Sequence, residues 1–470
     1  MKKGTVNTDI EIVDIGAKGM VIGKKDGEVF MCKDAVPGDV VSLEMRRKKK
    51  GVRQGVVKEI TKHSPLRTKP VCEHFDHCGG CNWQNLKYTE QLGFKERRVK
   101  EQIRRLAGLT DFEALPILGS DEIYHYRNKL EFTFVSHRWL TPQEIQDTEK
   151  IEERRGVGFH VPGRYDWVLH VNECHLQDSI HNGMRQFIYD QALTLEIPFY
   201  HPRNKTGILR NILFRNNRKG EWMILLVVQE HTEEVIKLTD LYLKQFPKTH
   251  SFWVIVNEKV NDSFNDCPAE LIYGEPHLVE TFKRPNDVGD VKYIIGPKSF
   301  FQTNPNQAER LYSVVYDFAG LTGSENIYDL YTGTGSIALF LANDAKQITG
   351  IEYVPEAIED AIKNAALNNV ENADFYAGDM KDVLTQEFIS KHGQPDVLVT
   401  DPPRAGMHGD VVQRILEASP KRIVYVSCDP ATQSRDIDLM KEKYQLIKIQ
   451  PVDMFPHTSH VENVALLELK

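Results

Sequence analysis

The sequence has few cysteines and no long apolar segment. Seven cysteines in 470 residues are too few and too unevenly spaced for a disulfide scaffold. The longest strongly apolar run, Trp222–Val228, is far shorter than the ~20 residues that a membrane-spanning helix needs. The basic start Met1–Thr5 is not followed by the apolar core of a signal peptide. We therefore expect a cytoplasmic protein with reduced thiols and no membrane segment.

The chain also lacks an overall basic excess, which at first argues against a nucleic-acid partner. It has 59 Lys and Arg against 67 Asp and Glu, a net charge of −8. The distribution is uneven, because residues 1–110 hold 23 basic and 14 acidic side chains, which leaves a net charge of −17 for the remainder. A basic N-terminal part attached to an acidic body can still bind nucleic-acid phosphates. The hydrophobic content of 41% is that of a globular protein, and the length predicts about three domains.

Residues 1–62 have the pattern of a small β barrel. Short β-rich segments alternate with glycine turns, which predicts a five-stranded barrel of OB type. The clearest candidate strands are Ile10–Asp14, Glu28–Cys32, Val40–Met45 and Gly55–Ile60. We expect the basic run Arg46–Lys50 to lie between the last two strands and to break their regular structure, either as a solvated loop or as a nucleic-acid contact.

Residues 63–295 are expected to form a cysteine-rich segment followed by an α+β domain. A helix is predicted over Tyr88–Leu106, and the polar stretch Ser136–Arg155 is interpreted as a surface insertion. The remaining pattern favours an antiparallel sheet. Its candidate strands are Lys129–Phe134, Gly207–Phe214, Trp222–Val228 and Phe252–Asn257.

Residues 296–470 show a different pattern, in which strands and helices alternate. This alternation predicts a parallel, doubly wound sheet with helices on both faces. The predicted strands are Asn326–Tyr331, Gln347–Glu352, Ala373–Ala377, Val397–Thr400 and Arg422–Ser427; the helices between them are Ile337–Ala345, Pro355–Asn368 and Gly409–Ser419.

A glycine-rich turn after the first of these strands is typical of a nucleotide site. The segment Asp329–Ser336 contains Gly333 and Gly335, which let the backbone approach a ligand ahead of a helix N-terminus. Glu352 ends the next strand, where a carboxylate can accept hydrogen bonds from ribose hydroxyls. Gly333, Gly335 and Ala338 also fit the dinucleotide pattern, so the turn alone leaves an NAD-dependent dehydrogenase open.

Further polar side chains follow the other strands and are expected at the same edge of the sheet. Asp379, after the third strand, either meets an adenine amino group or caps a helix. Asp401, after the fourth, begins a loop that Pro402 and Pro403 make stiff. In amino-methyltransferases a similar loop carries an aromatic residue that stacks on the target base. Arg404 stands in its place here, which argues against methylation of an amino group.

A thiol and a carboxylate complete this set of side chains. Cys428 follows the fifth strand and is a candidate nucleophile, while Glu462 lies among apolar residues, where burial favours a general base. Together they suit methylation of uracil C5. The Cys428 thiolate adds to C6, C5 takes a methyl group from a sulfonium donor, and Glu462 removes the C5 proton while Asp401 orients the base.

Residues 293–470 resemble the RNA uracil-C5-methyltransferase family of RumA/TrmA type. The matching segments are Ser299–Asn304, Asp329–Ser336, Asp401–Gly406, Ser427–Pro430 and His460–Asn463. The resemblance implies Cys428 as nucleophile, Glu462 as base, and S-adenosylmethionine (SAM) bound by Gln302, Tyr331, Ser336, Glu352, Asp379 and Asp401. Two positions depart from the family pattern. Ser336 stands where many members have Asn, and Asp379 stands where some have Asn.

Four cysteines form a candidate metal site. Cys72, Cys78 and Cys81 lie within ten residues, and Cys174 lies far downstream. Four thiolates suit either a zinc ion or an iron–sulfur cluster, and the spacing alone does not separate the two. The same methyltransferase family carries a [4Fe–4S] cluster on this Cys-x5-Cys-x2-Cys…Cys pattern, so the resemblance favours the cluster, with zinc as the alternative.

Residues 1–62 resemble the TRAM domain, an RNA-binding barrel. A TRAM domain together with the four cysteines resembles the 23S rRNA branch of the family (RlmD/RumA) more than the tRNA branch, which lacks both. We therefore expect a monomeric enzyme that acts on 23S rRNA and binds neither DNA nor membranes. A tRNA substrate is the first alternative, and an RNA-binding protein with an inactive methyltransferase domain is the second.

Overall fold

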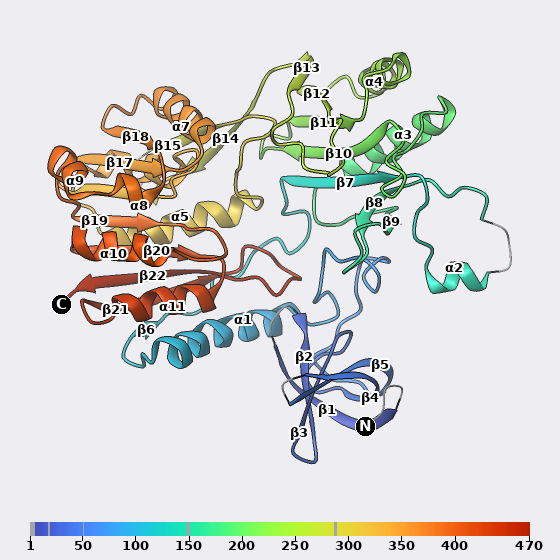
Figure 1. The fold of residues 1–470 in the computed structure, drawn as a ribbon, viewed down its shortest axis with the longest axis horizontal. Coiled ribbons are helices and arrows are strands. Elements are labelled where there is room, and N and C mark those ends of the chain that lie inside the picture. The colour runs from blue at the N-terminus through green and yellow to red at the C-terminus, as the bar shows by residue number, and fades with distance from the viewer. Residues whose placement is uncertain (1–4, 17–18, 50, 148–150, 286–288) are drawn as a thin grey trace.

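The computed structural model describes residues 5–16, 19–49, 51–147, 151–285 and 289–470. Three larger sheets account for most of the strands, and Figure 1 shows them as a barrel at the bottom, a central sheet at the upper right and a third sheet at the left. No helix in these residue ranges has the length and apolar character that crossing a membrane requires.

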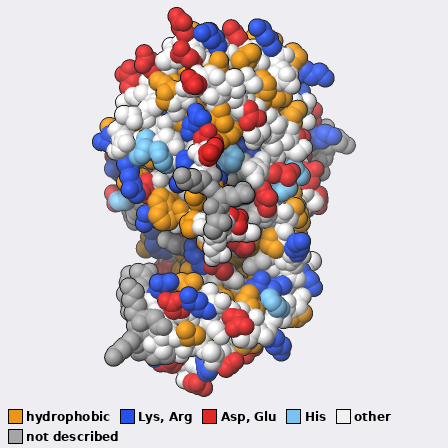
Figure 2. Space-filling view, turned by 90° about the vertical axis from the view of Figure 1, so that its right-hand side faces the viewer, with side chains coloured by type: hydrophobic (Ala, Val, Ile, Leu, Met, Phe, Trp, Pro, Cys, Tyr) orange, Lys and Arg blue, Asp and Glu red, His pale blue; other side chains and the backbone are white. Residues whose placement is uncertain are grey.

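The N-terminal barrel is closed, as the sequence predicts, with strand order β1-β2-β3-β5-β4. Its interior is filled by apolar side chains, among them Ile10, Phe30 and Leu43. It forms a lobe that a constriction separates from the body (Figure 2). The strands are β1 (Val6–Ile15), β2 (Val21–Lys25), β3 (Glu28–Cys32), β4 (Val40–Lys49) and β5 (Val52–Lys62).

The prediction that the basic run after Met45 breaks the strand structure is wrong. Strand β4 runs through Arg46 to Lys49, and Lys49 pairs with Val52 in a tight hairpin. Gly51 has φ +80° there, a backbone conformation that glycine adopts without strain. The basic residues therefore extend a strand instead of forming a loop.

The central sheet has seven strands in the order β13-β12-β11-β10-β7-β8-β9. It is antiparallel except for β11 and β12, which run parallel because helix α4 connects them across one face. Helices α3 and α4 pack on that face. The elements are β7 (Lys129–Val135), α2 (Pro142–Gln146), β8 (Gly156–His160), β9 (Val168–His170), α3 (Ile180–Thr194), β10 (Leu209–Asn216), β11 (Trp222–Val228), α4 (Glu233–Gln245), β12 (Ser251–Val256) and β13 (Ala269–Gly274).

The third sheet has the order β18-β17-β16-β19-β20-β22-β21-β6. Its first five strands are parallel and doubly wound, as predicted, and β22 and β21 extend them as an antiparallel pair. The hairpin β14 (Leu278–Lys283) and β15 (Asp290–Ile295) and helix α5 (Pro305–Ala319) precede this sheet. Its other elements are β16 (Asn326–Leu330), α6 (Ser336–Leu341), a 3-10 turn (Ala342–Asp344), β17 (Gln347–Glu352), α7 (Pro355–Leu367), β18 (Ala373–Ala377), α8 (Met380–Val383), α9 (Gln386–His392), β19 (Val397–Thr400), α10 (Gly409–Ala418), β20 (Arg422–Ser427), α11 (Pro430–Met440), β21 (Tyr444–Val452) and β22 (Glu462–Leu469).

A segment from the first half of the chain also joins this third sheet. Helix α1 (Tyr88–Gln102) continues as a π-helical turn (Ile103–Ala107), which contacts α11. Strand β6 (Glu113–Ala114) then pairs in parallel with β21. In Figure 1 the blue helix α1 lies directly below the red elements β21 and α11. Residues that precede the central sheet in sequence thus pack on the C-terminal sheet.

A buried ion pair fixes α1 to the loop that follows β21. Lys95 Nζ donates to Asp453 Oδ1 at 2.6 Å and to the Phe455 carbonyl oxygen at 3.0 Å, and both charged side chains are fully buried. Tyr88 donates its hydroxyl hydrogen to the other Asp453 oxygen at 2.9 Å. Burial of both charges is tolerated because each one is paired and hydrogen-bonded.

We expect Lys95→Met to lower the free energy of unfolding by about 3–5 kcal/mol, because Asp453 is left as an unpaired buried charge. Urea unfolding of the purified protein measures the change. Lys100→Met is the matched control on the same helix, since Lys100 pairs with Glu96 at the surface and its loss costs about 0.5 kcal/mol. Equal destabilisation by the two variants would contradict the structural role of the buried pair.

Candidate active site

The glycine-rich turn between β16 and α6 approaches the carboxyl end of β17. Tyr331, Gly333 and Gly335 all have positive φ, at +61°, +55° and +76°. Gly333 donates its backbone N–H to Glu352 Oε2 at 3.1 Å, and Val354 donates to Oε1 at 3.0 Å. The Glu352 carboxylate is therefore held beside the turn at the edge where open α/β sheets bind nucleotides.

Two further carboxyl groups meet between β16 and β19, where the strand order reverses. Asp329 is buried in β16 and accepts a 2.6 Å hydrogen bond from the Thr332 hydroxyl. Asp401 directly follows β19, whose last residue Thr400 pairs with Leu330 of β16. Burial raises the pKa of Asp329 to about 7, and burial together with the charge of Asp329 does the same for Asp401.

The register between β20 and β22 places the candidate nucleophile beside the candidate base. These strands are antiparallel, and Ser427 pairs with Asn463. Cys428, the residue directly after β20, therefore lies level with Glu462, the first residue of β22. Both residues stand at the carboxyl edge of the parallel strands, with Asp401.

The electrostatics show that these three side chains share one site. Burial raises the pKa of Glu462 to about 8, Asp401 adds to the rise, and Arg404 opposes it. Burial also raises the pKa of Cys428 to about 11, with Glu462 and Asp401 adding to the rise. The thiol is therefore protonated at neutral pH in the free protein, and its reaction requires a nearby group to take its proton.

An amide pair holds the start of β22 against α11. Asn463 donates its side-chain N–H to Gln433 Oε1 at 2.7 Å, and Gln433 donates to the carbonyl oxygens of Tyr425 and Asn463. All of these groups are buried. The sequence interpretation missed Gln433, whose only signal is its position three residues after the Cys428-Asp429-Pro430 segment.

The loop before Glu462 is held by residues that are remote in sequence. The backbone N–H groups of Asn82 and Trp83 both donate to the His457 carbonyl oxygen, at 2.8 and 3.0 Å. Gln91 of α1 accepts from the His457 backbone N–H at 2.9 Å, and its amide nitrogen contacts His457 Nδ1 at 3.1 Å. The cysteine-rich segment and α1 thus position the loop that leads to the candidate base.

Three of the predicted SAM-binding residues have contacts of their own in the protein. The Ser336 hydroxyl lies 2.9 Å from the Tyr312 hydroxyl, and Tyr293 donates to the Ser336 carbonyl oxygen. The Gln302 carbonyl oxygen accepts a 3.1 Å hydrogen bond from Asn128 of the central domain. Asp379 caps α8 and pairs with Lys381 at 3.3 Å, which is the helix-cap role left open by its position in the sequence.

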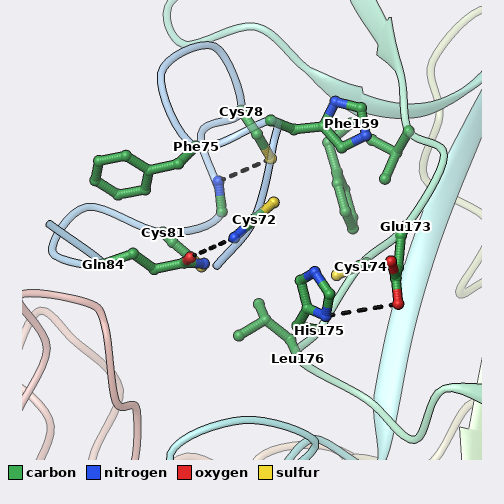
Figure 3. A pocket seen from close by; sticks show the side chains of 13 residues that line it. Cys72, Phe75, Cys78, Cys81, Gln84, Phe159, Glu173, Cys174, His175 and Leu176 are labelled. Carbon is green, nitrogen blue, oxygen red and sulfur yellow. Dashed lines mark hydrogen bonds and ion pairs between the residues drawn. The ribbon is translucent and has the colours of Figure 1, made fainter. Parts of the chain in front are cut away.

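Cys72, Cys78, Cys81 and Cys174 line one pocket (Figure 3). Cys78 Sγ accepts the Gly80 N–H at 3.4 Å, and Cys174 is held by a reciprocal pair of hydrogen bonds with Asn182. The fold therefore brings the distant fourth cysteine to the other three. Burial raises the pKa of Cys78 and of Cys81 to about 12.

The donor set of this pocket matches the predicted metal site in number and type of ligand. Within the described ranges, however, no group of three or more His, Cys, Asp or Glu side chains is arranged to hold a metal ion. The [4Fe–4S] cluster and its zinc alternative both stay predictions.

The C-terminal part of the chain matches a known protein family. The model of the family tRNA (Uracil-5-)-methyltransferase matches residues 278–470. An uncharacterized RNA methyltransferase of Bacteroides thetaiotaomicron is 48% identical over 460 residues, covering 97% of this chain and 100% of that protein. One of Porphyromonas gingivalis is 45% identical over 466 residues, covering 97% and 99%.

A solved structure matches along almost the whole chain. It is the Pyrococcus abyssi tRNA (uracil-54, C5)-methyltransferase in complex with S-adenosyl-L-homocysteine, with a TM-score of 0.74, 27% sequence identity, and coverage of 98% of this chain and 100% of that one. The expected 23S rRNA substrate stays a prediction, since this matching structure is described as a tRNA enzyme. These matches establish that the chain belongs to the RNA uracil-C5-methyltransferase family and is a SAM-dependent RNA methyltransferase.

Proposed function

We propose that this protein methylates C5 of a uridine in RNA through a covalent adduct on Cys428, with Glu462 as the base. One observation carries the proposal. The β20–β22 register places a thiol and a buried carboxyl group level with each other at the sheet edge where SAM enzymes of this fold bind their ligands. Neither a dehydrogenase nor an inactive RNA-binding domain accounts for this pair together with the Asp401-Pro402-Pro403 loop.

Each protein group has one role in the proposed reaction. Cys428 Sγ bonds to C6 of the flipped uracil, and its proton passes to a neighbouring carboxylate. The electron pair displaced to C5 bonds to the methyl group, which SAM supplies as a sulfonium. Glu462 then takes the C5 proton, the C5=C6 bond re-forms, and the Cys428 thiolate leaves. Asp401 holds the uracil ring in place during these steps.

The acidic side chains at this edge also suit a cationic methyl donor. Asp329, Glu352, Asp401 and Glu462 lie at this edge, and burial raises the pKa of Asp329, Asp401 and Glu462. A sulfonium near these groups favours their ionised forms and lowers the cost of forming the thiolate. We assign ribose binding to Glu352, and we assign the remaining SAM contacts to Gln302, Tyr331, Ser336 and Asp379.

We propose 23S rRNA as the substrate, with the barrel of residues 1–62 and the segment 63–295 holding the RNA in the cytoplasm. The basic charge of residues 1–110 supports binding to phosphates. A tRNA uridine is the second candidate, because the matching Pyrococcus abyssi structure is described as a tRNA (uracil-54, C5)-methyltransferase.

Mapping 5-methyluridine by mass spectrometry, in rRNA and tRNA from cells with and without the gene, tests both candidates. We expect one 23S rRNA site to lose 5-methyluridine without the gene and to stay unmethylated with Cys428→Ala, because this variant lacks the thiol that lies level with Glu462. Cys267→Ala, in a buried cysteine of the central domain, is the control and should restore the site. Loss confined to tRNA would favour the second candidate, and methylation by Cys428→Ala would refute the covalent route.

We expect Glu462→Gln to accumulate a protein–RNA adduct, because C5 is methylated but its proton is not removed. The adduct is measured as a shifted band on a denaturing gel. Glu468→Gln, on an exposed part of the same strand, is the matched control. Turnover of Glu462→Gln at the wild-type rate, with no adduct, would remove Glu462 from the role of base.

Folding stability gives an independent check on this variant. The pKa of Glu462 is raised in the folded protein to about 8 from 4.5, so the folded state retains a proton that the unfolded state loses. This group therefore opposes folding increasingly as the pH rises from about 4.5 to 8. The melting temperature of Glu462→Gln should exceed that of the wild type at pH 9, and the difference should shrink toward pH 5.

We also propose the four-cysteine pocket as the site of a [4Fe–4S] cluster, held by Cys72, Cys78, Cys81 and Cys174. The shared pocket and the four thiols support this proposal. The cluster would hold the segment that positions the His457 loop, since methyl transfer to uracil needs no electrons.

Anaerobic purification should yield a brown protein with about four irons per chain, and Cys174→Ser should lose the colour. Iron and zinc analysis measures the difference. Cys32→Ser, in the barrel core, is the control and should retain the iron. A colourless protein with one zinc would favour the alternative metal.

A further inference from the structure

A group of cations surrounds the residue that lies two positions before the proposed base. His460 lies outside β22, and its ring meets Phe455 edge-on at 6.3 Å. Burial lowers the pKa of His460 to about 4. The positive charges of Arg404, Lys95, Arg98 and Arg127 also lower it. His460 is thus a neutral imidazole at physiological pH, and positive charges approach it from α1, from the segment just before β7 and from the Asp401 loop.

Direct contacts place two of these arginines on the same loop. Arg98 of α1 donates from Nη1 to the Ser459 carbonyl oxygen at 2.8 Å, directly before His460. The Arg127 guanidinium lies 5.4 Å from the centre of the Phe455 ring. His460 is therefore flanked by one guanidinium bonded to the preceding residue, Ser459, and by another beside the Phe455 ring that it contacts.

The charges of these arginines are not neutralised by carboxylates. Among the described residues, neither Arg98 nor Arg127 forms an ion pair, whereas Lys95 of the same group is fully paired with Asp453. The buried Arg127 Nε has no hydrogen-bond partner. Guanidinium groups that have no carboxylate partner are suited to bind an anion.

We propose that Arg98, Arg127 and His460 bind a backbone phosphate of the substrate RNA, next to the uridine that reacts with Cys428. The inference rests on the proposed function and adds a phosphate subsite to it. Two residues span at most about 7 Å, so a phosphate on His460 lies close to the base that Glu462 serves.

The subsite offers what an extruded nucleotide requires. Flipping a base out of its stack costs a few kcal/mol, which contacts to the displaced backbone can offset. Each guanidinium donates to phosphate oxygens, and the neutral imidazole donates one N–H. These contacts carry no sequence information, and they fix the position of the nucleotide relative to the thiol.

Salt dependence of RNA binding tests the subsite. The probe is a transcript that contains the mapped uridine, and its Kd is measured over a range of salt concentrations. We expect Arg98→Met to raise Kd several-fold and to reduce the slope of log Kd against log salt by about 0.7–1, the loss of one phosphate contact. Arg97→Met, one residue away on the exposed side of α1 and stacked on Phe94, should match the wild type.

The conservative variant Arg98→Lys distinguishes a role of the Arg98 charge in RNA binding from a role of Arg98 in supporting the loop. Arg98→Lys keeps the cation but disturbs the bond to Ser459, so it should recover most of the salt slope. If Arg98→Lys and Arg98→Met lower turnover equally while both keep the wild-type slope, Arg98 only supports the loop and the proposal is overturned. Identical binding by Arg98→Met and Arg97→Met would overturn it as well.

A chemically altered RNA locates the phosphate. A methylphosphonate, which has no charge, replaces the phosphate on the 5′ or the 3′ side of the uridine in turn. One of the two substitutions should weaken wild-type binding and cause no further loss in Arg98→Met. Equal additional losses in both proteins would refute the contact. The proposed function is tested separately by measuring the 5-methyluridine that the wild type forms on the unmodified RNA. Failure of the proposed function can therefore be distinguished from failure of the phosphate subsite.

Discussion

The antiparallel pairing of β22 with β20 is the constraint on which the proposed chemistry depends. The parallel part of the sheet brings the glycine turn, Glu352, Asp401 and Cys428 to one edge. Glu462 is the first residue of the last strand, so it reaches that edge only if this strand runs in the opposite direction. Because β22 is antiparallel, its first residue lies at the carboxyl edge, and the Ser427–Asn463 pair sets Glu462 level with Cys428. A shift of one residue would turn Glu462 to the other face of the sheet.

Burial of carboxyl groups at this edge has a cost for folding and a use in catalysis. Asp329, Asp401 and Glu462 all have a raised pKa, and each raises that of a neighbour or of Cys428. Such groups destabilise the folded state in the pH range where the unfolded chain would ionise them. In return, the site holds proton acceptors whose pKa lies near neutrality, where a general base works best. The same negative field favours a sulfonium over a neutral or anionic cofactor.

The chain also connects parts that are far apart in sequence. The loop before Glu462 is held from three directions: by the backbone of Asn82 and Trp83, by Gln91, and by the buried Lys95–Asp453 pair. Arg98, on the same helix, reaches the end of this loop. The cysteine-rich segment and α1 therefore support the loop that leads to Glu462, and they do so whether the four thiols hold a cluster, a zinc ion or neither.

The sequence by itself determined the barrel, the parallel sheet and the residue types at its edge. Glycine turns, strand–helix alternation and side chains directly after strands are local signals, and each depends only on neighbouring residues. Predictions from the local sequence pattern were wrong where contacts between distant residues determined the structure. The basic run after Met45 became part of β4 because β5 pairs with it, and the central sheet is mixed because α4 crosses one face.

Only the tertiary structure decided which distant residues meet. No local pattern indicates that β6 joins the C-terminal sheet, that Cys174 completes the pocket of Cys72, or that Arg98 and Arg127 flank His460. Such contacts join segments separated by many residues, so they depend on how the three sheets pack and not on the propensities of any one segment.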